Sequence, residues 1–387
     1  MADWSGPVES VGLMADDVIR LSKSVIGDAE KQAVMGVLDR EYLGMGHKVQ
    51  EFENLLTQFF DRPAVCVNTG TSALHLALQA LGVGPGDEVL VQSLTYVASF
   101  QAISATGAKP VPCEVDPATI TIDINDAKKR LTDKTKVIMP VHYASGMGAL
   151  DEIYAFAKEN GLRVVEDAAH AFGGYYNGKK VGSFGDIACF SFDGIKNITS
   201  GEGGTIVTND KTVLQKVRDA RLLGVEKDTE KRFSGNRSWD FDVRYQGWRY
   251  HMSDIMAAIG IEQFKRLPEF ATRRRDLVKR YRQNLEAIGS IELLEQDIDH
   301  IVPHIFVIKI KTGNREIIRR ILLEHGIQTG VHYQPNHVLS FYNFGGNISL
   351  PATEDLFQQL LTLPLHTELE ESDIDYICEQ LIRCLDQ

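Results

Sequence analysis

Short apolar runs alternate with longer segments of helical period between about residues 64 and 210. The helical segments, such as 72–81 and 149–160, repeat their apolar residues at three- and four-residue steps. Several of the short runs are apolar along their whole length, which is typical of a mostly parallel sheet covered by helices on both faces. The predicted strands are 64–67, 88–92, 110–114, 136–141, 163–166, 187–192 and 205–208.

The pattern changes after residue 250. Helical periods at 253–264 and 267–288 precede a strand at 304–310, and helices at 314–325 and 371–385 follow. We therefore expect a large α/β domain over residues 1–265 and a smaller α+β domain over residues 266–387. The N-terminal helix is a candidate for packing on the small domain. The basic run of Arg273, Arg274 and Arg275 is interpreted as a solvated helix face.

The charge, the apolar runs and the cysteines of the chain argue against several classes of function. Lys and Arg total 41 against 53 Asp and Glu, a net charge of −12, which disfavours a nucleic-acid or anionic-membrane partner. We find no apolar run of about 18 residues and no signal-peptide pattern, so we expect a cytoplasmic protein. The five cysteines have wide, irregular gaps, which predicts reduced, buried thiols and no metal site.

Polar residues that follow the strands are the first candidates for a site, because open sheets bind ligands beyond the carboxyl ends of their strands. Gly70, Thr71 and Ser72 open a helix after the first strand, where backbone amides favour an anion. Tyr96 follows the second strand and could stack on a planar ligand. Taken singly, these residues are also typical of a helix cap and of a core tyrosine.

Two charged residues follow later strands. Asp167 ends a buried strand, where it is either a helix cap or a carboxylate that holds a proton on a heteroaromatic nitrogen. Lys196 comes directly after the next apolar strand, and a lysine near apolar groups has a lowered pKa and can form a Schiff base. Together, the anion-binding helix start, the aromatic ring, the acid and the lysine match what pyridoxal 5′-phosphate (PLP) requires.

The chain also resembles a known family, the nucleotide-sugar aminotransferases of the DegT/StrS type. These are fold type I PLP enzymes related in architecture to aspartate aminotransferase, so the resemblance implies that fold and that cofactor. It runs along nearly the whole chain, in order, at residues 43–46, 52–53, 70–74, 85–89, 165–170, 190–192, 196–197, 201–204, 252–255, 257–258, 332–333 and 363–366, with a mild departure at 193–195.

The resemblance implies roles for individual residues. Lys196 would bind the cofactor covalently and move a proton, Asp167 would pair with the pyridine nitrogen, and His170 would lie near the 3′-oxygen. The implied contacts to the rest of the cofactor are stacking by Tyr96 and phosphate binding by Gly70, Thr71, Ser72 and Ser191. Glu202 matches the family pattern, but no role follows for it.

One segment departs from the family pattern. Arg249 stands where many members have an Asn that reaches the phosphate of the neighbouring subunit's cofactor. An arginine could bind that phosphate through its fork of donors, so we expect a homodimer with active sites at the subunit interface.

The resemblance implies transfer of an amino group from L-glutamate to C-3 or C-4 of a nucleotide-linked deoxysugar, for amino-sugar or O-antigen-type polysaccharide synthesis. Retention of Lys196, where some members have His, favours transamination over dehydration. A PLP-dependent sugar dehydratase and a non-catalytic PLP-binding regulator remain alternatives. A Rossmann oxidoreductase is disfavoured, because no Gly-x-Gly-x-x-Gly follows the first strand.

Overall fold

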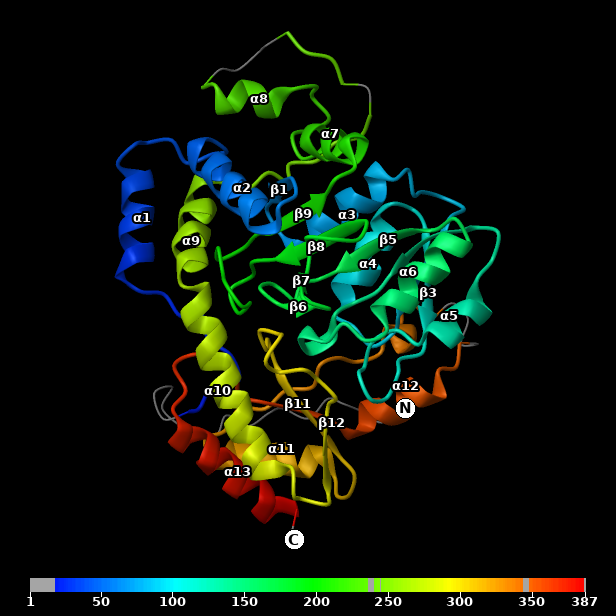
Figure 1. The fold of residues 1–387 in the computed structure, drawn as a ribbon, viewed down its shortest axis with the longest axis vertical. Coiled ribbons are helices and arrows are strands. Elements are labelled where there is room, and N and C mark those ends of the chain that lie inside the picture. Colours follow the sequence, from blue (N-terminus) through cyan, green and yellow to red (C-terminus); the bar gives the residue numbers. More distant parts are fainter. Residues whose placement is uncertain (1–17, 236–239, 244, 344–347, 386–387) are drawn as a thin grey trace.

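The computed structural model describes residues 18–235, 240–243, 245–343 and 348–385. Its centre is a seven-stranded sheet in the order β1-β9-β8-β5-β4-β2-β3, and only β9 runs antiparallel to its neighbours. The carboxyl ends of the other six strands therefore meet at one edge (Figure 1). The strands are β1 (Ala64–Val67), β2 (Glu88–Gln92), β3 (Lys109–Cys113), β4 (Thr135–Met139), β5 (Arg163–Asp167), β8 (Ile187–Ser191) and β9 (Gly204–Thr208).

Helices cover both faces of this sheet. One face carries α3 (Gly70–Ala80), α4 (Val97–Ala105) and α7 (Lys211–Ala220). The other face carries α2 (His47–Phe60), α5 (Ile124–Arg130), α6 (Leu150–Glu159) and α9 (Asp254–Lys265). The predicted α/β architecture is confirmed, and each strand of this sheet begins and ends within two residues of its predicted limits.

A smaller antiparallel sheet follows in the chain and lies in the lower part of Figure 1. It has the order β10-β11-β12 and is accompanied by helices α11, α12 and α13. The long helix α10 (Leu267–Leu285) leads from α9 into this part. The bounds are β10 (Ile291–Leu293), β11 (Phe306–Ile310), β12 (Leu360–Leu363), α11 (Arg315–Glu324), α12 (Pro351–Gln359) and α13 (Glu371–Leu385).

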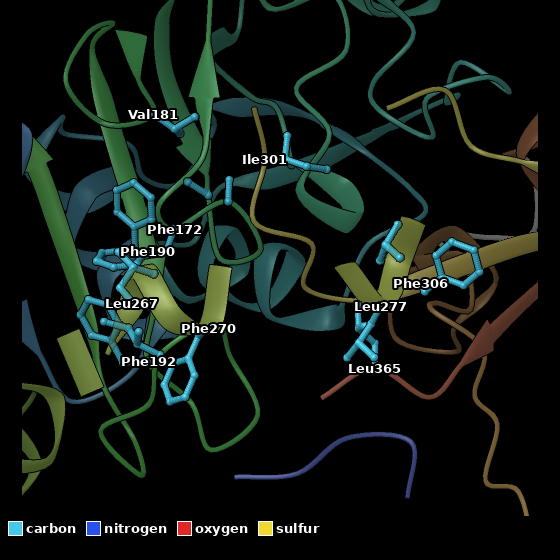
Figure 2. Packing of buried hydrophobic residues seen from close by; sticks show 14 of the residues in the cluster. Phe172, Val181, Phe190, Phe192, Leu267, Phe270, Leu277, Ile301, Phe306 and Leu365 are labelled. Carbon is cyan, nitrogen blue, oxygen red and sulfur yellow. The ribbon is translucent and has the colours of Figure 1, made fainter. Parts of the chain in front are cut away.

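The two sheets share one hydrophobic cluster. Figure 2 shows Leu267 and Phe270 of α10 near Phe192, and Leu277 farther along the same helix near Phe306. Burial of this continuous apolar surface stabilises the two parts together. The division at residue 265 stays a prediction.

The N-terminal part contacts several elements. Helix α1 (Asp28–Leu38) packs against α9, and Glu30 of α1 forms an ion pair of 2.9 Å with Arg266. In the segment before α1, the backbone of Ile19 pairs with Ile327 and the carbonyl of Leu21 accepts from Leu365. The packing of the N-terminal helix on the small domain stays a prediction.

The interpretation of the basic run on α10 is wrong for one of its three members. Arg274 is only 4% exposed, and its guanidinium donates to the carbonyls of Pro303, His304 and Leu365. Backbone acceptors on two other segments, which the sequence does not reveal, therefore bind this side chain. Among the described helices, none is long and apolar enough to cross a membrane.

The short strands β6 (Tyr175–Tyr176) and β7 (Lys179–Lys180) were not predicted. They form a hairpin whose two turn residues, Asn177 and Gly178, both have positive φ (48° and 74°). Asn-Gly is the sequence signal that such a turn favours.

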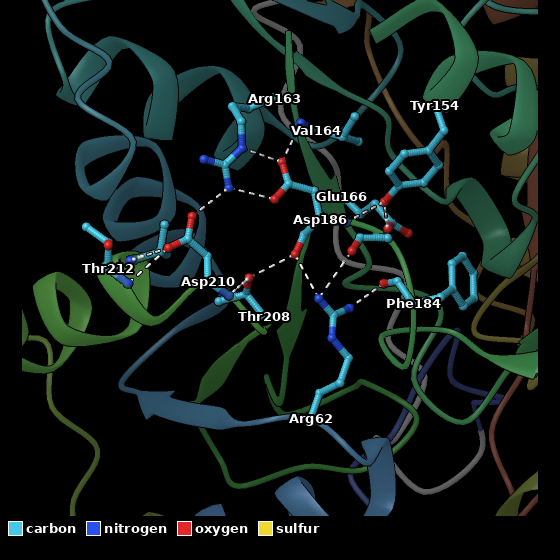
Figure 3. Close-up of polar contacts among 12 residues, drawn as sticks. Arg62, Tyr154, Arg163, Val164, Glu166, Phe184, Asp186, Thr208, Asp210 and Thr212 are labelled. Atoms are coloured by element: carbon cyan, nitrogen blue, oxygen red, sulfur yellow. Dashed lines mark hydrogen bonds and ion pairs between the residues drawn. The ribbon is translucent and has the colours of Figure 1, made fainter. Parts of the chain in front are cut away.

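A polar network fixes β5 beside β8 at their amino ends (Figure 3). Arg163 donates two hydrogen bonds of 2.7 Å to the carboxylate of Asp186, and the same carboxylate accepts from the backbone of Val164. Arg62 adds a bond to the carbonyl of Asp186. These contacts hold the register of the two strands, so that Asp167 lies opposite Cys189 at their other ends.

Candidate active site

A cavity of about 450 Å³ opens where the carboxyl ends of β1, β5 and β8 meet the segment that follows β2. Most of the predicted site residues line it, although they come from four separate segments of the chain. They are Gly70, Thr71, Tyr96, Asp167, His170, Ser191 and Lys196, and Glu202 joins them. The structure therefore brings these side chains to one place; it does not do so for Ser72 and Arg249.

Asp167 is the last residue of β5, at the carboxyl end of the strand, and is 5% exposed. Its carboxylate accepts hydrogen bonds from Ser99 Oγ at 2.7 Å and from the backbone N–H of Ala169 at 3.2 Å. Burial is the main influence on this group and raises the pKa of Asp167. Residues 168–174 are turns and irregular backbone, so the carboxylate caps no helix and stays available to a cation in the cavity.

The alternation of side chains along β5 explains why Asp167 faces the cavity and Glu166 does not. Successive side chains of a strand point to opposite faces. Glu166 accordingly binds away from the cavity, where its carboxylate meets the hydroxyl of Tyr154 and Nε2 of His142. The end of β5 therefore presents one acid to the cavity and buries the other in the core.

Lys196 follows β8 in a turn and is half-buried. Loss of contact with water lowers the pKa of its amine to about 8, although the carboxylates of Asp167 and Asp193 oppose this shift. Such an amine is partly uncharged near neutral pH and can act as a nucleophile or base. These properties are not those of a freely solvated surface lysine.

His170 is held in one tautomer. The backbone N–H of Ala144 donates to Nδ1 at 3.3 Å, so the ring proton lies on Nε2, which donates to the hydroxyl oxygen of Tyr333 at 3.1 Å. Burial, followed by the charge of Lys196, holds the pKa of His170 well below its usual range. The ring is therefore neutral, and the hydroxyl proton of Tyr333 is free to be donated to a ligand.

The start of α3 lies tightly against the end of β8. A Cβ atom added at Gly70 would come 2.8 Å from Cβ of Ser191, which is closer than side chains approach. Glycine thus lets the first turn of the helix and the hydroxyl of Ser191 line the same wall. Thr71 is exposed at that wall, where the positive end of the helix favours an anion.

Ser72 does not point into the cavity. Its hydroxyl bonds to Asn68 Oδ1 at 2.5 Å and to Thr69 Oγ1 at 2.6 Å, and its backbone amide is capped by Thr69. Its predicted phosphate contact stays a prediction.

Tyr96 is 59% exposed at the mouth of the cavity, so it is not a core tyrosine. Its ring centre lies 5.5 Å from that of Tyr333, at an interplanar angle of 49°. An exposed aromatic ring at this position can stack on a planar ligand.

Arg249 lies outside this cavity. It is exposed and lines a second cavity, of about 140 Å³, with Arg232, Phe241 and His251. Within one subunit it does not border the cavity of Lys196.

Sequence reasoning missed several residues at the site. Ser99 supports Asp167, Tyr333 bonds to His170, and His304 lies beside Lys196. Tyr333 could have been found, because His332 and Tyr333 belong to a segment that matches the family pattern. We recognise no sequence signal that marks Ser99 or His304.

The chain is similar in sequence to known aminotransferases and their relatives. The sequence model of the DegT/DnrJ/EryC1/StrS aminotransferase family matches residues 24–382. Spore coat polysaccharide biosynthesis protein SpsC of Bacillus subtilis is 36% identical over 368 residues, which are 92% of this chain and 95% of that protein.

Solved structures are similar over nearly the whole chain. The aminotransferase TlmJ from Streptoalloteichus hindustanus superposes with a TM-score of 0.88 at 31% identity, covering 95% of this chain and 99% of that one. The PLP form of Spr1654 from Streptococcus pneumoniae has a TM-score of 0.87 at 30% identity, with the same coverage. The chain belongs to the DegT/DnrJ/EryC1/StrS aminotransferase family, as the sequence predicted.

Proposed function

We propose that this protein transfers an amino group from L-glutamate to a keto group at C-3 or C-4 of a nucleotide-linked deoxysugar. The observation that carries the proposal is the meeting of Lys196 and Asp167 in one cavity, with an anion-favouring wall beside them. Family membership supports the reaction class. The name of the Bacillus relative supports a product used in polysaccharide synthesis, of which an O-antigen is one case.

The cavity fits the predicted cofactor. The exposed ring of Tyr96 offers a stacking face, the carboxylate of Asp167 offers a partner for a protonated ring nitrogen, and Lys196 offers the amine. Thr71 and Ser191 place hydroxyls at the positive end of α3, beside the close approach that Gly70 permits. PLP is the cofactor of this enzyme family, and the relative Spr1654 has been solved with PLP and in its PMP form.

Bound PLP supplies an electron sink for the carbon that gains or loses the amine. The protein's own groups supply the rest. Lys196, whose pKa is about 8, moves the proton between carbon atoms, and Asp167 keeps the ring nitrogen protonated. The neutral His170 positions the hydroxyl of Tyr333 toward the cavity.

We infer that the active enzyme is a homodimer. A cofactor phosphate is a dianion, and Lys196 is the only cation among the described residues that line the cavity. Arg249 of a neighbouring subunit would supply the missing charge through paired, charge-assisted hydrogen bonds. We also infer a cytoplasmic location, because all five cysteines are free and four of them are buried.

A labelled-nitrogen assay tests the proposal. Purified protein loaded with PLP is incubated with ¹⁵N-glutamate and a panel of nucleotide-linked 3-keto and 4-keto sugars, and the products are weighed by mass spectrometry. We expect ¹⁵N in the sugar product of at least one substrate, and none with Lys196→Ala.

The same assay separates the alternatives. A product that has lost water without gaining nitrogen would favour a dehydratase. PLP binding with no turnover of any sugar or of glutamate would favour a non-catalytic regulator. Either outcome would contradict the proposed reaction.

A further inference from the structure

The amine of Lys196 ends beside a histidine that the sequence did not single out. Nζ of Lys196 lies 3.5 Å from Nε2 of His304, although the two residues are 108 positions apart. His304 lies just before β11 and is 4% exposed. Among the described residues it is the hydrogen-bond partner that the structure gives to Nζ.

The imidazole of His304 is neutral. Burial, followed by the charges of Lys196 and other nearby groups, holds the pKa of His304 well below its usual range. An ammonium group has only donors, so Nε2 accepts from Lys196 and the single ring proton lies on Nδ1. In this state His304 can hold the amine without adding a charge.

Packing alone does not explain a histidine at this position. Nδ1 of His304 is buried and has no hydrogen-bond partner among the described residues. A buried polar atom without a partner lowers stability, and an apolar ring of similar size would avoid that loss. The arrangement therefore indicates a role for the other ring nitrogen, the one that faces Lys196.

The ring is held firmly in place. Its ring packs against that of His170, with centres 4.4 Å apart and an interplanar angle of 47°. The backbone N–H of His304 donates to Ser145 Oγ at 3.1 Å, and its carbonyl accepts from Arg274 at 3.1 Å. Segments from both parts of the molecule thus fix the position of Nε2.

We propose that His304 is a positioning residue that receives the amine of Lys196 whenever that amine is not bound to the cofactor. The proposal rests on the transamination proposed above, in which Lys196 alternates between a covalently bound and a free amine. A lysine side chain has four carbon–carbon torsions, so a released amine needs a fixed acceptor to stay near the reacting carbon. No covalent bond to His304 is made or broken; only the hydrogen bond from Lys196 forms and is lost.

The geometry also suits the proton transfer. A neutral amine that donates one hydrogen to Nε2 keeps its lone pair free for the substrate proton. A carboxylate acceptor in the same place would instead favour the charged ammonium, which has no lone pair. The neutral imidazole therefore positions the base without inactivating it.

Other titratable groups also face Lys196. The carboxylates of Asp167 and Asp193 raise the pKa of its amine, and burial lowers it. The remaining titratable side chains at the cavity or beside Lys196, among the described residues, are Lys23, Tyr96, His170, Cys189, Glu202, Arg274, His332 and Tyr333. All of these stay in place in the variants below, so a change can be assigned to position 304.

Two substitutions separate positioning from packing. His304→Phe keeps a flat ring against His170 but removes the acceptor, whereas His304→Gln loses the ring and keeps an acceptor near the position of Nε2. The matched control is His366→Phe, because His366 is also buried (6% exposed) and also has an Nδ1 without a partner among the described residues, whereas Nζ of Lys196 bonds to His304. Thermal unfolding followed by circular dichroism confirms that each variant is folded at the assay temperature.

The first readout needs no substrate. In cofactor-free protein, the pH dependence of acetylation of Lys196 by acetic anhydride is measured by peptide mass spectrometry. We expect a midpoint near 8 in the parent, a midpoint about one pH unit lower in His304→Phe, and values close to the parent in His304→Gln and His366→Phe. An unchanged midpoint in His304→Phe would overturn the proposal.

The second readout uses the PLP-loaded enzyme and L-glutamate. We expect kcat to fall about tenfold in His304→Phe with little change in KM, and to stay within about threefold of the parent in His304→Gln. The reverse order, with Phe active and Gln inactive, would show that only packing matters. If no transfer occurs at all but the acetylation midpoint shifts as expected, the proposed reaction fails while the contact between His304 and Lys196 stands.

Discussion

Replacement of Asp167 by Asn tests the role of the acid at the end of β5. The substitution keeps the shape of the side chain, and its surroundings can accept it. The carbonyl oxygen of Asn can still accept from the backbone of Ala169, and the amide can donate to Ser99 Oγ, whose hydroxyl can turn to accept. We therefore expect Asp167→Asn to fold and to retain much of its PLP.

The loss in rate follows from the charge that disappears. Two opposite charges about 3 Å apart attract by about 5 kcal/mol at an effective dielectric constant of about 20. A neutral amide retains part of this interaction as a hydrogen bond, so we expect a loss of about 3–4 kcal/mol in the transition state. That corresponds to a fall in rate of about 100-fold or more.

The assay is the release of 2-oxoglutarate from L-glutamate under single-turnover conditions, with bound PLP measured by absorbance after gel filtration. Asp193→Asn is the matched control, because it removes the same charge from the same cavity without touching the end of β5. We expect the control to lose less than about tenfold. Near-normal turnover in Asp167→Asn would refute the assignment, and an equal loss in both variants would show that only the net charge of the cavity matters.

Three further substitutions are expected to have distinct effects. Arg249→Ala should weaken PLP retention, and mixing it with Lys196→Ala should restore some activity, because one site of a heterodimer keeps both residues; inactive mixtures of subunits that demonstrably exchange would contradict the cross-subunit contact. Gly70→Ala should lower PLP affinity about tenfold or more, measured by equilibrium dialysis, because its Cβ would lie 2.8 Å from that of Ser191; unchanged affinity would show that this wall does not bind the cofactor. Phe172→Ala should lower the free energy of unfolding by about 3–5 kcal/mol, because the buried ring of Phe172 packs against five other phenylalanine rings. Urea titration measures this change, and a loss below about 1 kcal/mol would contradict the reasoning.

Much of the large domain was predictable because its strands are buried on both faces. Such strands appear as continuous apolar runs, and their limits agree with the structure. The order of the strands in the sheet was not predictable. β1 pairs with β9, which lies about 140 residues later, and local pattern carries no information on such pairings.

Some residues of the site were likewise predictable from the sequence and others were not. Asp167 and Ser191 are the last residues of β5 and β8, and Lys196 lies in the segment after β8, so their positions in the chain alone placed them at one edge of the sheet. Ser99 and His304 owe their places to contacts across 68 and 108 residues, which only the folded chain reveals. The hairpin of β6 and β7 is a different case, because its Asn-Gly signal was present in the sequence and was overlooked.

Borohydride reduction of the PLP-loaded protein, followed by peptide mapping, tests most directly that the cavity beside Asp167 holds the cofactor. Reduction fixes PLP to the lysine that carries it, and mass spectrometry locates that lysine. The account predicts a label on Lys196 and loss of labelling in Lys196→Ala. A label on another lysine, such as the buried Lys309 of the small domain, or no retained PLP at all, would contradict it.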